Sequence, residues 1–306
     1  MARAAVEARL PISLVEARPG RELAVHRRAG ATNKPALFFV HGSCASMLQY
    51  EPLIARFASS GHEVIAYDYL GCGRSPKPNA WYAYAFEELY LDLNAIIERF
   101  GADKKRKNVL ICHSAGCALG LMAAARAAPD AAASVDGLCL LAPVSGLPNA
   151  HPLFYLPVFV LNRLQPTMSA AFEGLALHQK TRDGVTEARQ SVLALAKDVN
   201  SANPMHMCKA YYRQGSRGAP TSDEVRAAGQ RVPIVVLSGS DDGLLPPGTA
   251  EAVLALLPAA TTHHVVADTS HQLMQEEPEV VGKHIEAFVA QLVSRGGVLG
   301  GLFTGR

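Results

Sequence analysis

The stretch Val109-Leu-Ile-Cys-His-Ser-Ala-Gly116 decides the fold of this chain. Its first residues form a short apolar run typical of a strand buried on both faces, and the Ala-rich run 115–128 predicts a helix that Pro129 ends. Ser114 therefore lies in a strand–turn–helix junction. Such a junction can hold a serine nucleophile in a strained turn, because small flanking residues let the helix approach the strand closely. A serine that only caps the helix is the alternative interpretation.

Strand and helix patterns alternate on both sides of this junction. Strands are predicted in residues 12–29, as a pair joined at Pro19-Gly20, and at 36–40, 64–67, 138–141, 233–237 and 262–267. Helices are predicted at 47–60, 84–100, 247–257 and 277–294. Because such alternation covers parallel strands with helices, the sequence predicts an α/β fold with a mostly parallel sheet.

The alternation stops between residues 147 and 230, where several segments have a helical pattern and no buried strand is evident. We interpret this interruption as a helical cap inserted into one continuous core. The predicted organisation is a first core part at 1–146, the cap at 147–230, a second core part at 231–294 and a flexible tail at 295–306. The tail contains five glycines, which favours fraying.

A serine hydroxyl is a poor nucleophile unless a neighbouring base removes its proton. His271 is the candidate base for Ser114, because it lies between the last predicted strand and the last helix, in a loop at the carboxyl edge of the sheet. The third member of a triad orients the imidazole, and two aspartates follow strand 233–237. Their spacing from the preceding glycine and the following proline favours Asp242 over Asp241, which is interpreted as a turn residue.

Acyl transfer also needs donors for a developing oxyanion. One predicted donor is the amide of Ala115, directly after the nucleophile. The other is the amide of Ser43, in the loop after strand 36–40, where Gly42 lets the backbone turn inward. A short loop that only leads into a helix is the alternative interpretation.

The apolar, aromatic segment at 151–161 is interpreted either as the wall of an acyl-chain pocket or mobile lid, or as cap residues that only pack on the core. The residues predicted to bind substrate are His41, Gly42, His113, Phe154 and Phe159, with Tyr211 and Tyr212 as candidates for the cavity entrance.

The composition predicts a soluble folded protein, with 49% hydrophobic and 18% charged residues. A net charge of +2 gives no global field that would favour nucleic acid or a membrane. No run of about 18 apolar residues predicts a membrane span, although peripheral membrane contact stays open. The basic run 104–107 is interpreted as a solvated loop, with contact to an anionic group as the alternative.

Six cysteines occur without CxxC or metal-ligand spacing and without a signal-peptide pattern in residues 1–10. We therefore expect reduced thiols, no metal and an intracellular, cytoplasmic location, with organellar targeting left open. Oligomeric state is not indicated. The cysteines are Cys44, Cys72, Cys112, Cys117, Cys139 and Cys208.

Five motifs in order resemble those of the α/β-hydrolase superfamily over roughly residues 12–294. They are His41-Gly42, Asp68-Tyr-Leu-Gly-Cys-Gly-Arg-Ser75, Cys112-His-Ser-Ala-Gly116, Gly239-Ser-Asp-Asp242 and Ser270-His-Gln-Leu-Met-Gln-Glu-Glu-Pro278. Within the superfamily, the chain looks most similar to the group of α/β-hydrolase domain-containing protein 8. The resemblance implies an eight-stranded, mostly parallel sheet, helices on both faces, an inserted helical cap and no cofactor.

The sequence departs from the superfamily pattern at two positions, because Cys112 and Ser270 stand where glycine is usual. Neither change removes a reacting atom. Ser114 stands where epoxide hydrolases and haloalkane dehalogenases of this fold use aspartate, which argues against those activities. The predicted function is a serine hydrolase that cleaves carboxylic esters, including lipid or acylglycerol esters, through an acyl-enzyme. An acyltransferase with the same triad and a non-catalytic binding or scaffold protein are the alternatives.

Overall fold

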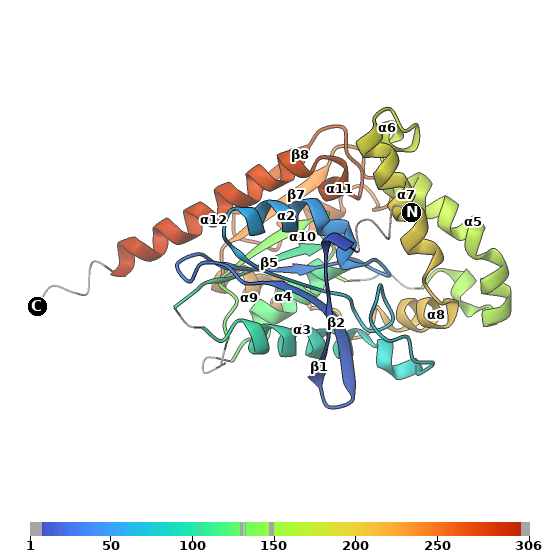
Figure 1. Cartoon of the computed structure of the whole chain (residues 1–306), viewed down its shortest axis with the longest axis horizontal. Coiled ribbons are helices and arrows are strands. Elements are labelled where there is room, and N and C mark those ends of the chain that lie inside the picture. The colour runs from blue at the N-terminus through green and yellow to red at the C-terminus, as the bar shows by residue number, and fades with distance from the viewer. Residues whose placement is uncertain (1–7, 104, 129–130, 132, 147–149, 301–306) are drawn as a thin grey trace, which may run out of the picture.

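The computed structural model describes residues 8–300 except 104, 129–130, 132 and 147–149, with only the backbone for 295–300. The described strands form an eight-stranded sheet in the order β1-β2-β4-β3-β5-β6-β7-β8 (Figure 1). They are β1 (Ser13–Arg18), β2 (Arg21–Arg28), β3 (Ala36–Val40), β4 (Glu63–Tyr67), β5 (Asn108–His113), β6 (Gly137–Leu141), β7 (Ile234–Gly239) and β8 (Thr262–Val266).

Strand direction in this sheet confirms the predicted mostly parallel arrangement. The pairs β1–β2 and β2–β4 are antiparallel, whereas the strands from β4 through β3 to β8 run parallel. The carboxyl ends of parallel strands meet at one edge of a sheet, where sites of α/β proteins form. The loops after β3, β5, β7 and β8 therefore bring the four predicted catalytic segments to the same edge.

Helices cover both faces of the sheet, as the sequence predicted. Strand residues alternate between two cores, so that Leu110 and Cys112 of β5 face α3, α4 and α9, while Val109 and Ile111 face α2 and α12. These core helices, with four short ones, are α2 (Glu51–Ser59), α3 (Phe86–Phe100), α4 (Ala115–Arg126), α9 (Ser222–Arg231), α10 (Thr249–Leu254), α11 (Leu273–Glu276), α12 (Pro278–Gly300), η1 (Met47–Tyr50) and η2 (Trp81–Tyr84).

A helical insertion follows β6 and gathers at one end of the molecule (Figure 1). We call its helices the cap, namely η3 (Pro152–Tyr155), α5 (Val158–Ala176), α6 (Gln179–Arg182), α7 (Glu187–Ser201) and α8 (Met205–Gln214). Helix α9 lies inside the predicted cap range 147–230, yet it packs extensively on α4 of the core. We therefore propose a division in which α9 belongs to the core and the cap ends after α8.

The C-terminal helix differs from its sequence-based prediction. Helix α12 continues to Gly300, beyond the expected end at residue 294, so the backbone at 295–300 is helical where a flexible tail was expected. The rest of that predicted tail, 301–306, lies outside the described residues, as do residues 1–7 and Lys104 of the basic run.

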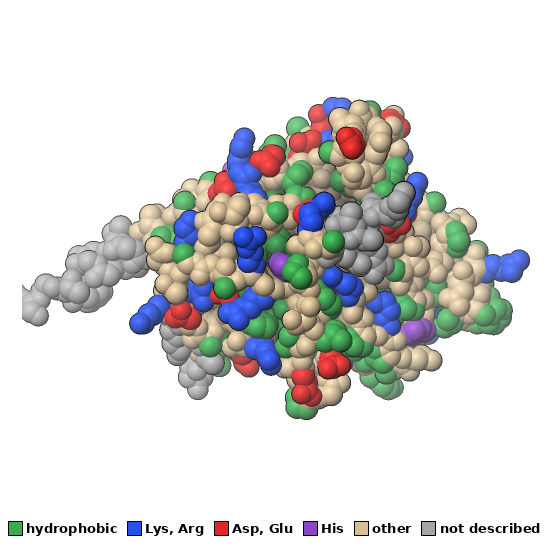
Figure 2. All heavy atoms as spheres, viewed as in Figure 1, with side chains coloured by type: hydrophobic (Ala, Val, Ile, Leu, Met, Phe, Trp, Pro, Cys, Tyr) green, Lys and Arg blue, Asp and Glu red, His purple; other side chains and the backbone are tan. Residues whose placement is uncertain are grey.

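No helix among the described residues combines the length and apolar character needed to cross a bilayer. On the face shown in Figure 2, basic and acidic side chains are interspersed and form no large area of one sign. This surface agrees with the small net charge of the chain.

Packing between β5 and α4 explains how the chain accommodates cysteine at position 112. Gly120 of α4 faces this side chain, and a Cβ built on Gly120 would lie 2.6 Å from the Cys112 Sγ atom. The missing side chain on the helix therefore makes room for the extra one on the strand. Cys112 and Gly120 form a complementary pair, because close-packed interiors tolerate one of the two volumes but not both.

We predict that Gly120→Ala destabilises the chain by about 1–3 kcal/mol through overpacking. The same substitution in a Cys112→Ala background should cost less, because its nearest remaining neighbours would be Leu138 Cδ2 at 3.6 Å and the Cβ of residue 112 at 3.7 Å, both at ordinary contact distance. Urea unfolding of the wild type, the two single variants and the double variant measures the coupling energy between positions 112 and 120.

Gly174→Ala is the matched control, since a Cβ on this helical glycine meets nothing within 4 Å. It should be neutral or stabilising by up to about 1 kcal/mol. Equal costs for Gly120→Ala in both backgrounds would contradict the proposed pairing.

Candidate active site

Ser114 occupies a strained turn between β5 and α4. Its backbone has φ 52° and ψ −122°, a conformation that non-glycine residues rarely adopt, and its N–H donates to the Leu141 carbonyl at 2.9 Å. A Cβ on Gly116 would lie 2.6 Å from the Val40 carbonyl oxygen, and one on Gly42 would lie 3.1 Å from the Ser114 Cβ. Only glycine fits these two approaches, as the sequence pattern indicated.

His271 and Asp242 lie in contact on the loops after β8 and β7. The His271 Nδ1 is 2.9 Å from Asp242 Oδ2, and Asp242 Oδ1 accepts the N–H groups of Leu244 and Leu245 at 3.0 and 3.1 Å. Burial raises the pKa of the Asp242 carboxyl, but the hydrogen bond and charge interaction with His271 and these two N–H groups together lower the pKa below its usual value. A carboxylate held this way can orient an imidazole with Nδ1 as donor.

Asp241 does not contact His271. Its carboxylate accepts the Ser240 hydroxyl and lies 3.6 Å from His178 Nε2 of the cap. Of the two adjacent aspartates, the geometry therefore brings Asp242 to the imidazole, in line with the spacing argument.

The loop after β3 forms a tight turn in which the Ala45 N–H donates to the Gly42 carbonyl at 3.3 Å. Ser43 and Cys44 are its central residues, and Cys44 has φ 50°. Ser43 lines the same cavity as Ser114. The Ala115 amide lies at the first position of α4, where an N–H has no acceptor within its own helix. The two predicted oxyanion donors thus flank the nucleophile candidate.

The motif 68–75 supports this loop through one buried carboxylate. Asp68 Oδ1 accepts the Ser46 hydroxyl at 2.9 Å and the Met47 N–H at 2.7 Å, while Oδ2 accepts the Arg74 N–H at 2.8 Å. A Cβ on Gly73 would lie 2.1 Å from the same carboxylate, so the turn needs glycine there. The motif has a structural contact in this chain, because its Asp68 holds the residues that follow the turn at 42–45.

His41 and His113 are both buried, and each has a structural hydrogen bond. His41 Nδ1 pairs with the Gly42 carbonyl at 2.8 Å, and its Nε2 accepts the Tyr69 N–H at 3.0 Å, so its ring lies away from the cavity. His113 lines the cavity, and its Nε2 donates to the His271 carbonyl at 2.9 Å. Burial lowers the pKa of both rings, and the neighbouring His271 lowers that of His113 further.

Ser114 and His271 line a cavity of about 580 Å³ between core and cap. Phe154 lines a neighbouring apolar cavity of about 420 Å³, which shares a wall with the first at Ser43, Phe172, Tyr212 and Leu244. Phe159, by contrast, is 75% exposed and lines neither cavity, which corrects its predicted role in substrate binding. Tyr212 lines both, whereas Tyr211 donates its hydroxyl to Ser43 Oγ at 3.2 Å.

The sequence reasoning missed Phe172 and Gln272, which line the cavity. Gln272 follows His271 directly, and this adjacency could have indicated it. Phe172 lies in a long amphipathic helix whose pattern does not distinguish a cavity wall from ordinary packing.

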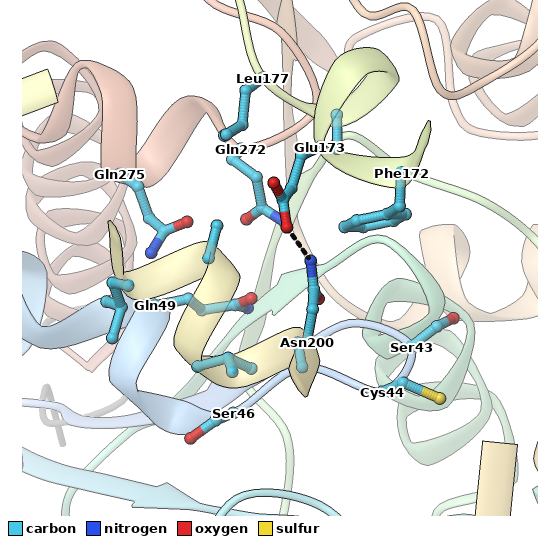
Figure 3. Close-up of a pocket in the computed structure, with 15 residues that line it drawn as sticks. Ser43, Cys44, Ser46, Gln49, Phe172, Glu173, Leu177, Asn200, Gln272 and Gln275 are labelled. Atoms are coloured by element: carbon cyan, nitrogen blue, oxygen red, sulfur yellow. Dashed lines mark hydrogen bonds between the residues drawn. The ribbon is translucent and has the colours of Figure 1, made fainter. Parts of the chain in front are cut away.

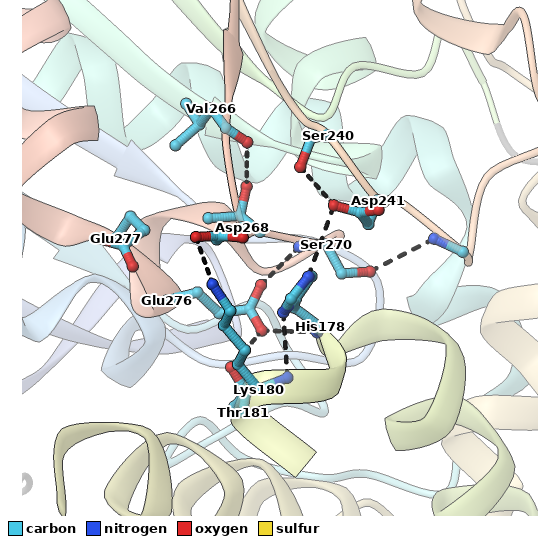
Figure 4. A network of polar contacts seen from close by, with 12 residues as sticks. His178, Lys180, Thr181, Ser240, Asp241, Val266, Asp268, Ser270, Glu276 and Glu277 are labelled. Atoms are coloured by element: carbon cyan, nitrogen blue, oxygen red, sulfur yellow. Dashed lines mark hydrogen bonds and ion pairs between the residues drawn. The ribbon is translucent and has the colours of Figure 1, made fainter. Parts of the chain in front are cut away.

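A polar network joins the cap to the His271 loop (Figure 4). The buried Glu276 carboxylate accepts the His178 N–H at 2.7 Å, the Thr181 hydroxyl at 2.6 Å and the Ser270 N–H at 2.7 Å. Arg189 of α7 donates to Thr181 Oγ1 at 2.8 Å and pairs with Glu277 at 2.6 Å. Cap residues therefore help to hold the residue that precedes His271.

Ser270 has a specific function in this junction. Its hydroxyl donates to the Leu175 carbonyl at 3.0 Å, and the Gln272 N–H donates to the Ala176 carbonyl at 3.2 Å. Both acceptors are at the end of α5, where helix carbonyls lack partners within their own helix. The serine that replaces the usual glycine thus binds the end of a cap helix beside His271.

Among the described residues, no group of three or more His, Cys, Asp or Glu side chains is placed to hold a metal ion. All six cysteines are free thiols in the structure.

The fold and this edge arrangement are those of an α/β-hydrolase. A family model described as Hydrolase_4, serine aminopeptidase, S33, matches residues 31–278, and the chain belongs to this family. Human Protein ABHD8 is 29% identical over 262 residues, which cover 85% of this chain and 56% of that protein. The predicted resemblance is confirmed, although this chain spans about half the length of the ABHD8 proteins it matches.

Solved structures with the same fold include two hydrolytic enzymes. The enol-lactonase from Burkholderia xenovorans matches with a TM-score of 0.73 at 20% identity, over 92% of this chain and 100% of that chain. An esterase from Thermogutta terrifontis matches with a TM-score of 0.70 at 20% identity, over 92% of this chain and 98% of that chain. At such identities the similarity concerns the fold.

The lowered pKa values of His41 and His113 predict how stability depends on pH. The unfolded chain takes up protons on these rings near pH 6.5, whereas the native state takes them up only at lower pH. The contribution of the two neutral rings to the free energy of unfolding should therefore be complete above about pH 6.5. As the pH is lowered from there, the free energy of unfolding should decrease by up to about 1.4 kcal/mol per pH unit for each ring. His113→Asn should reduce this slope, measured by urea unfolding from pH 5 to 8.

Substitution of the exposed His151 by Gln is the control for this experiment and should leave the slope as in the wild type. A slope in His113→Asn as steep as in the wild type would contradict the prediction.

The junction in Figure 4 predicts that Glu276→Gln destabilises the chain by about 1.5–3 kcal/mol, because the amide would turn a donor toward the Ser270 N–H. The exposed helical substitution Glu98→Gln should change the free energy of unfolding by less than about 0.5 kcal/mol. Equal effects of the two substitutions in thermal or urea unfolding would show that the carboxylate does not hold the junction.

Proposed function

We propose that this chain is a serine hydrolase that cleaves carboxylic esters through an acyl-enzyme, with Ser114, His271 and Asp242 as the triad. One observation carries the proposal: the strained Ser114 lines the same cavity as His271, whose ring is paired with Asp242. A structural serine would not require φ 52°, a conformation that costs about 1–3 kcal/mol.

In the proposed reaction, Ser114 Oγ attacks the ester carbonyl while His271 Nε2 takes its proton, and Asp242 stabilises the resulting imidazolium. The amides of Ser43 and Ala115 donate to the oxyanion of the tetrahedral intermediate. Its collapse breaks the ester bond, and the leaving alcohol receives the proton from His271. A water molecule then attacks the acyl-enzyme by the same steps and releases the acid.

The neighbouring apolar cavity of about 420 Å³ supports an acyl chain as one part of the substrate. Its walls come mostly from the cap and include Phe154, Met168 and Met205. A lipid or acylglycerol ester would satisfy this arrangement. The exposed Tyr155 and Phe159 on the cap support peripheral contact with a lipid surface.

Ser114→Ala is expected to reduce kcat on an activated ester by a factor on the order of 10⁴ or more, because the attacking atom is lost while the fold is preserved. The matched control Ser191→Ala, an exposed serine of α7, should retain wild-type turnover. A fluorophosphonate probe should label the wild type and the control but not Ser114→Ala.

Wild-type turnover in Ser114→Ala would show that the triad is wrongly assigned. Absence of both turnover and labelling in the wild type would favour a non-catalytic binding or scaffold protein. If added alcohol or lysolipid acceptors divert most of the acyl product from water, the chain is an acyltransferase with the same triad.

A further inference from the structure

A second, small pocket lies beside the cavity that contains Ser114 and His271, and both polar and apolar side chains line it (Figure 3). Its volume is about 40 Å³, and it shares Ser43, Ala45, Phe172 and Gln272 with the larger cavity. By the usual measure for buried water, this volume has room for roughly three water-sized groups. The pocket is therefore large enough for a small polar end of a substrate.

Two amide oxygens in this pocket have no hydrogen-bond partner among the described residues. They are Oε1 of Gln49 and Oε1 of Gln272, on side chains that are only 5% and 8% exposed. The orientation of the Gln49 amide follows from its neighbour. His113 Nε2 donates to a carbonyl, so its Nδ1 is an acceptor and the Gln49 NH₂ group must face it, at 3.4 Å. The Gln49 oxygen is then left without a donor.

Glu173 adds a carboxylate to the same pocket, from the cap helix α5 (Figure 3). Glu173 is 8% exposed. Among the described residues, its carboxylate accepts one hydrogen bond, from Asn200 Nδ2 at a long 3.4 Å. No Lys, Arg or His of the described residues forms an ion pair with it. Buried carboxylates are ordinarily paired with a cation or with several donors, because desolvation is costly. The pocket thus contains a buried carboxylate without a cation and two amide oxygens without donors among the described residues.

We propose that this pocket binds a primary ammonium group of the substrate. An ammonium carries three N–H donors and one positive charge, which match the two amide oxygens and the carboxylate of Glu173. The inference rests on the proposed function and adds a substrate class to it. The ester that this site selects carries an apolar acyl part and a primary amine.

Other ligand classes fit the pocket less well. An anion would be repelled by the Glu173 carboxylate, and no Lys, Arg or His is among the described residues that line the pocket. A quaternary ammonium has no N–H to donate and is bound by aromatic cages, whereas Phe172 is the one aromatic residue of this pocket. A hydroxyl group supplies one donor and leaves the Glu173 charge unpaired.

The first test compares esters of equal length that end in a primary ammonium, an N-acetyl group, a trimethylammonium or a methyl group. The wild type should show a kcat/KM for the ammonium ester about 10- to 100-fold above that for the three others. Glu173→Gln should lose this preference, so that its kcat/KM ratio of the ammonium ester to the methyl ester falls to about one. The exposed Glu187→Gln should behave as the wild type.

A second measurement detects binding directly, without turnover, and uses two different pocket substitutions so that misfolding of one variant does not decide the result. Butylammonium binding to Ser114→Ala is measured by calorimetry, with butan-1-ol as the neutral analogue, and is repeated in Ser114→Ala with Glu173→Gln or with Gln272→Leu. Butylammonium should bind and butan-1-ol should not, and each additional substitution should weaken binding at least fivefold.

The outcomes distinguish this inference from the proposed function. Turnover of the methyl ester that depends on Ser114, without an ammonium preference and without butylammonium binding, overturns the inference and leaves the serine hydrolase intact. Failure to hydrolyse any ester, with butylammonium still bound through Glu173, overturns the hydrolase and keeps the ammonium site. Binding of butylammonium that Glu173→Gln and Gln272→Leu do not change places the amine elsewhere and overturns the inference.

Discussion

The close approach of α4 to the end of β3 positions the rest of the candidate active site. A Cβ on Gly116 would lie 2.6 Å from the Val40 carbonyl oxygen, so helix and strand meet with no side chain between them. Ser114, two residues before this contact, has the unusual φ of 52°, and Gly42 in the loop after β3 lies against the serine. The proposed nucleophile and the proposed oxyanion donors therefore lie around one close contact, since the amide of Ala115 belongs to the same turn.

Much of the core could be predicted from the sequence, because buried parallel strands are short apolar runs and the junction at Ser114 is a local pattern. The choice of Asp242 also followed from local spacing. Features that depend on distant contacts could not be predicted in this way. Helix α9 has the same kind of pattern as the cap helices, and only its packing on α4 separates it from them. Phe154 and Phe159 lie in one apolar segment, yet the fold buries the first and exposes the second.

The two departures from the superfamily pattern show why single positions are hard to interpret alone. Cys112 is accommodated by Gly120, eight positions along the chain on a different element, and the Ser270 hydroxyl donates to the Leu175 carbonyl at the end of α5. In each case the residue that makes the change acceptable comes from another part of the fold. A motif that is compared residue by residue shows the substitution but not the residue that accommodates it. Both positions therefore look unfavourable in the sequence, although the structure shows each in a packed contact.

The end of α5 connects recognition with catalysis in the proposed mechanism. Glu173 points into the small pocket, and two residues later the carbonyls of Leu175 and Ala176 accept hydrogen bonds from the residues on either side of His271. A helix end is stiff over so short a distance, so these positions move together. A displacement of the cap would therefore remove the proposed ammonium acceptor and also release the loop that holds the imidazole. In this proposal, selectivity for the amine and alignment of the base depend on the same few residues, which would make the cap part of the active site rather than only its cover.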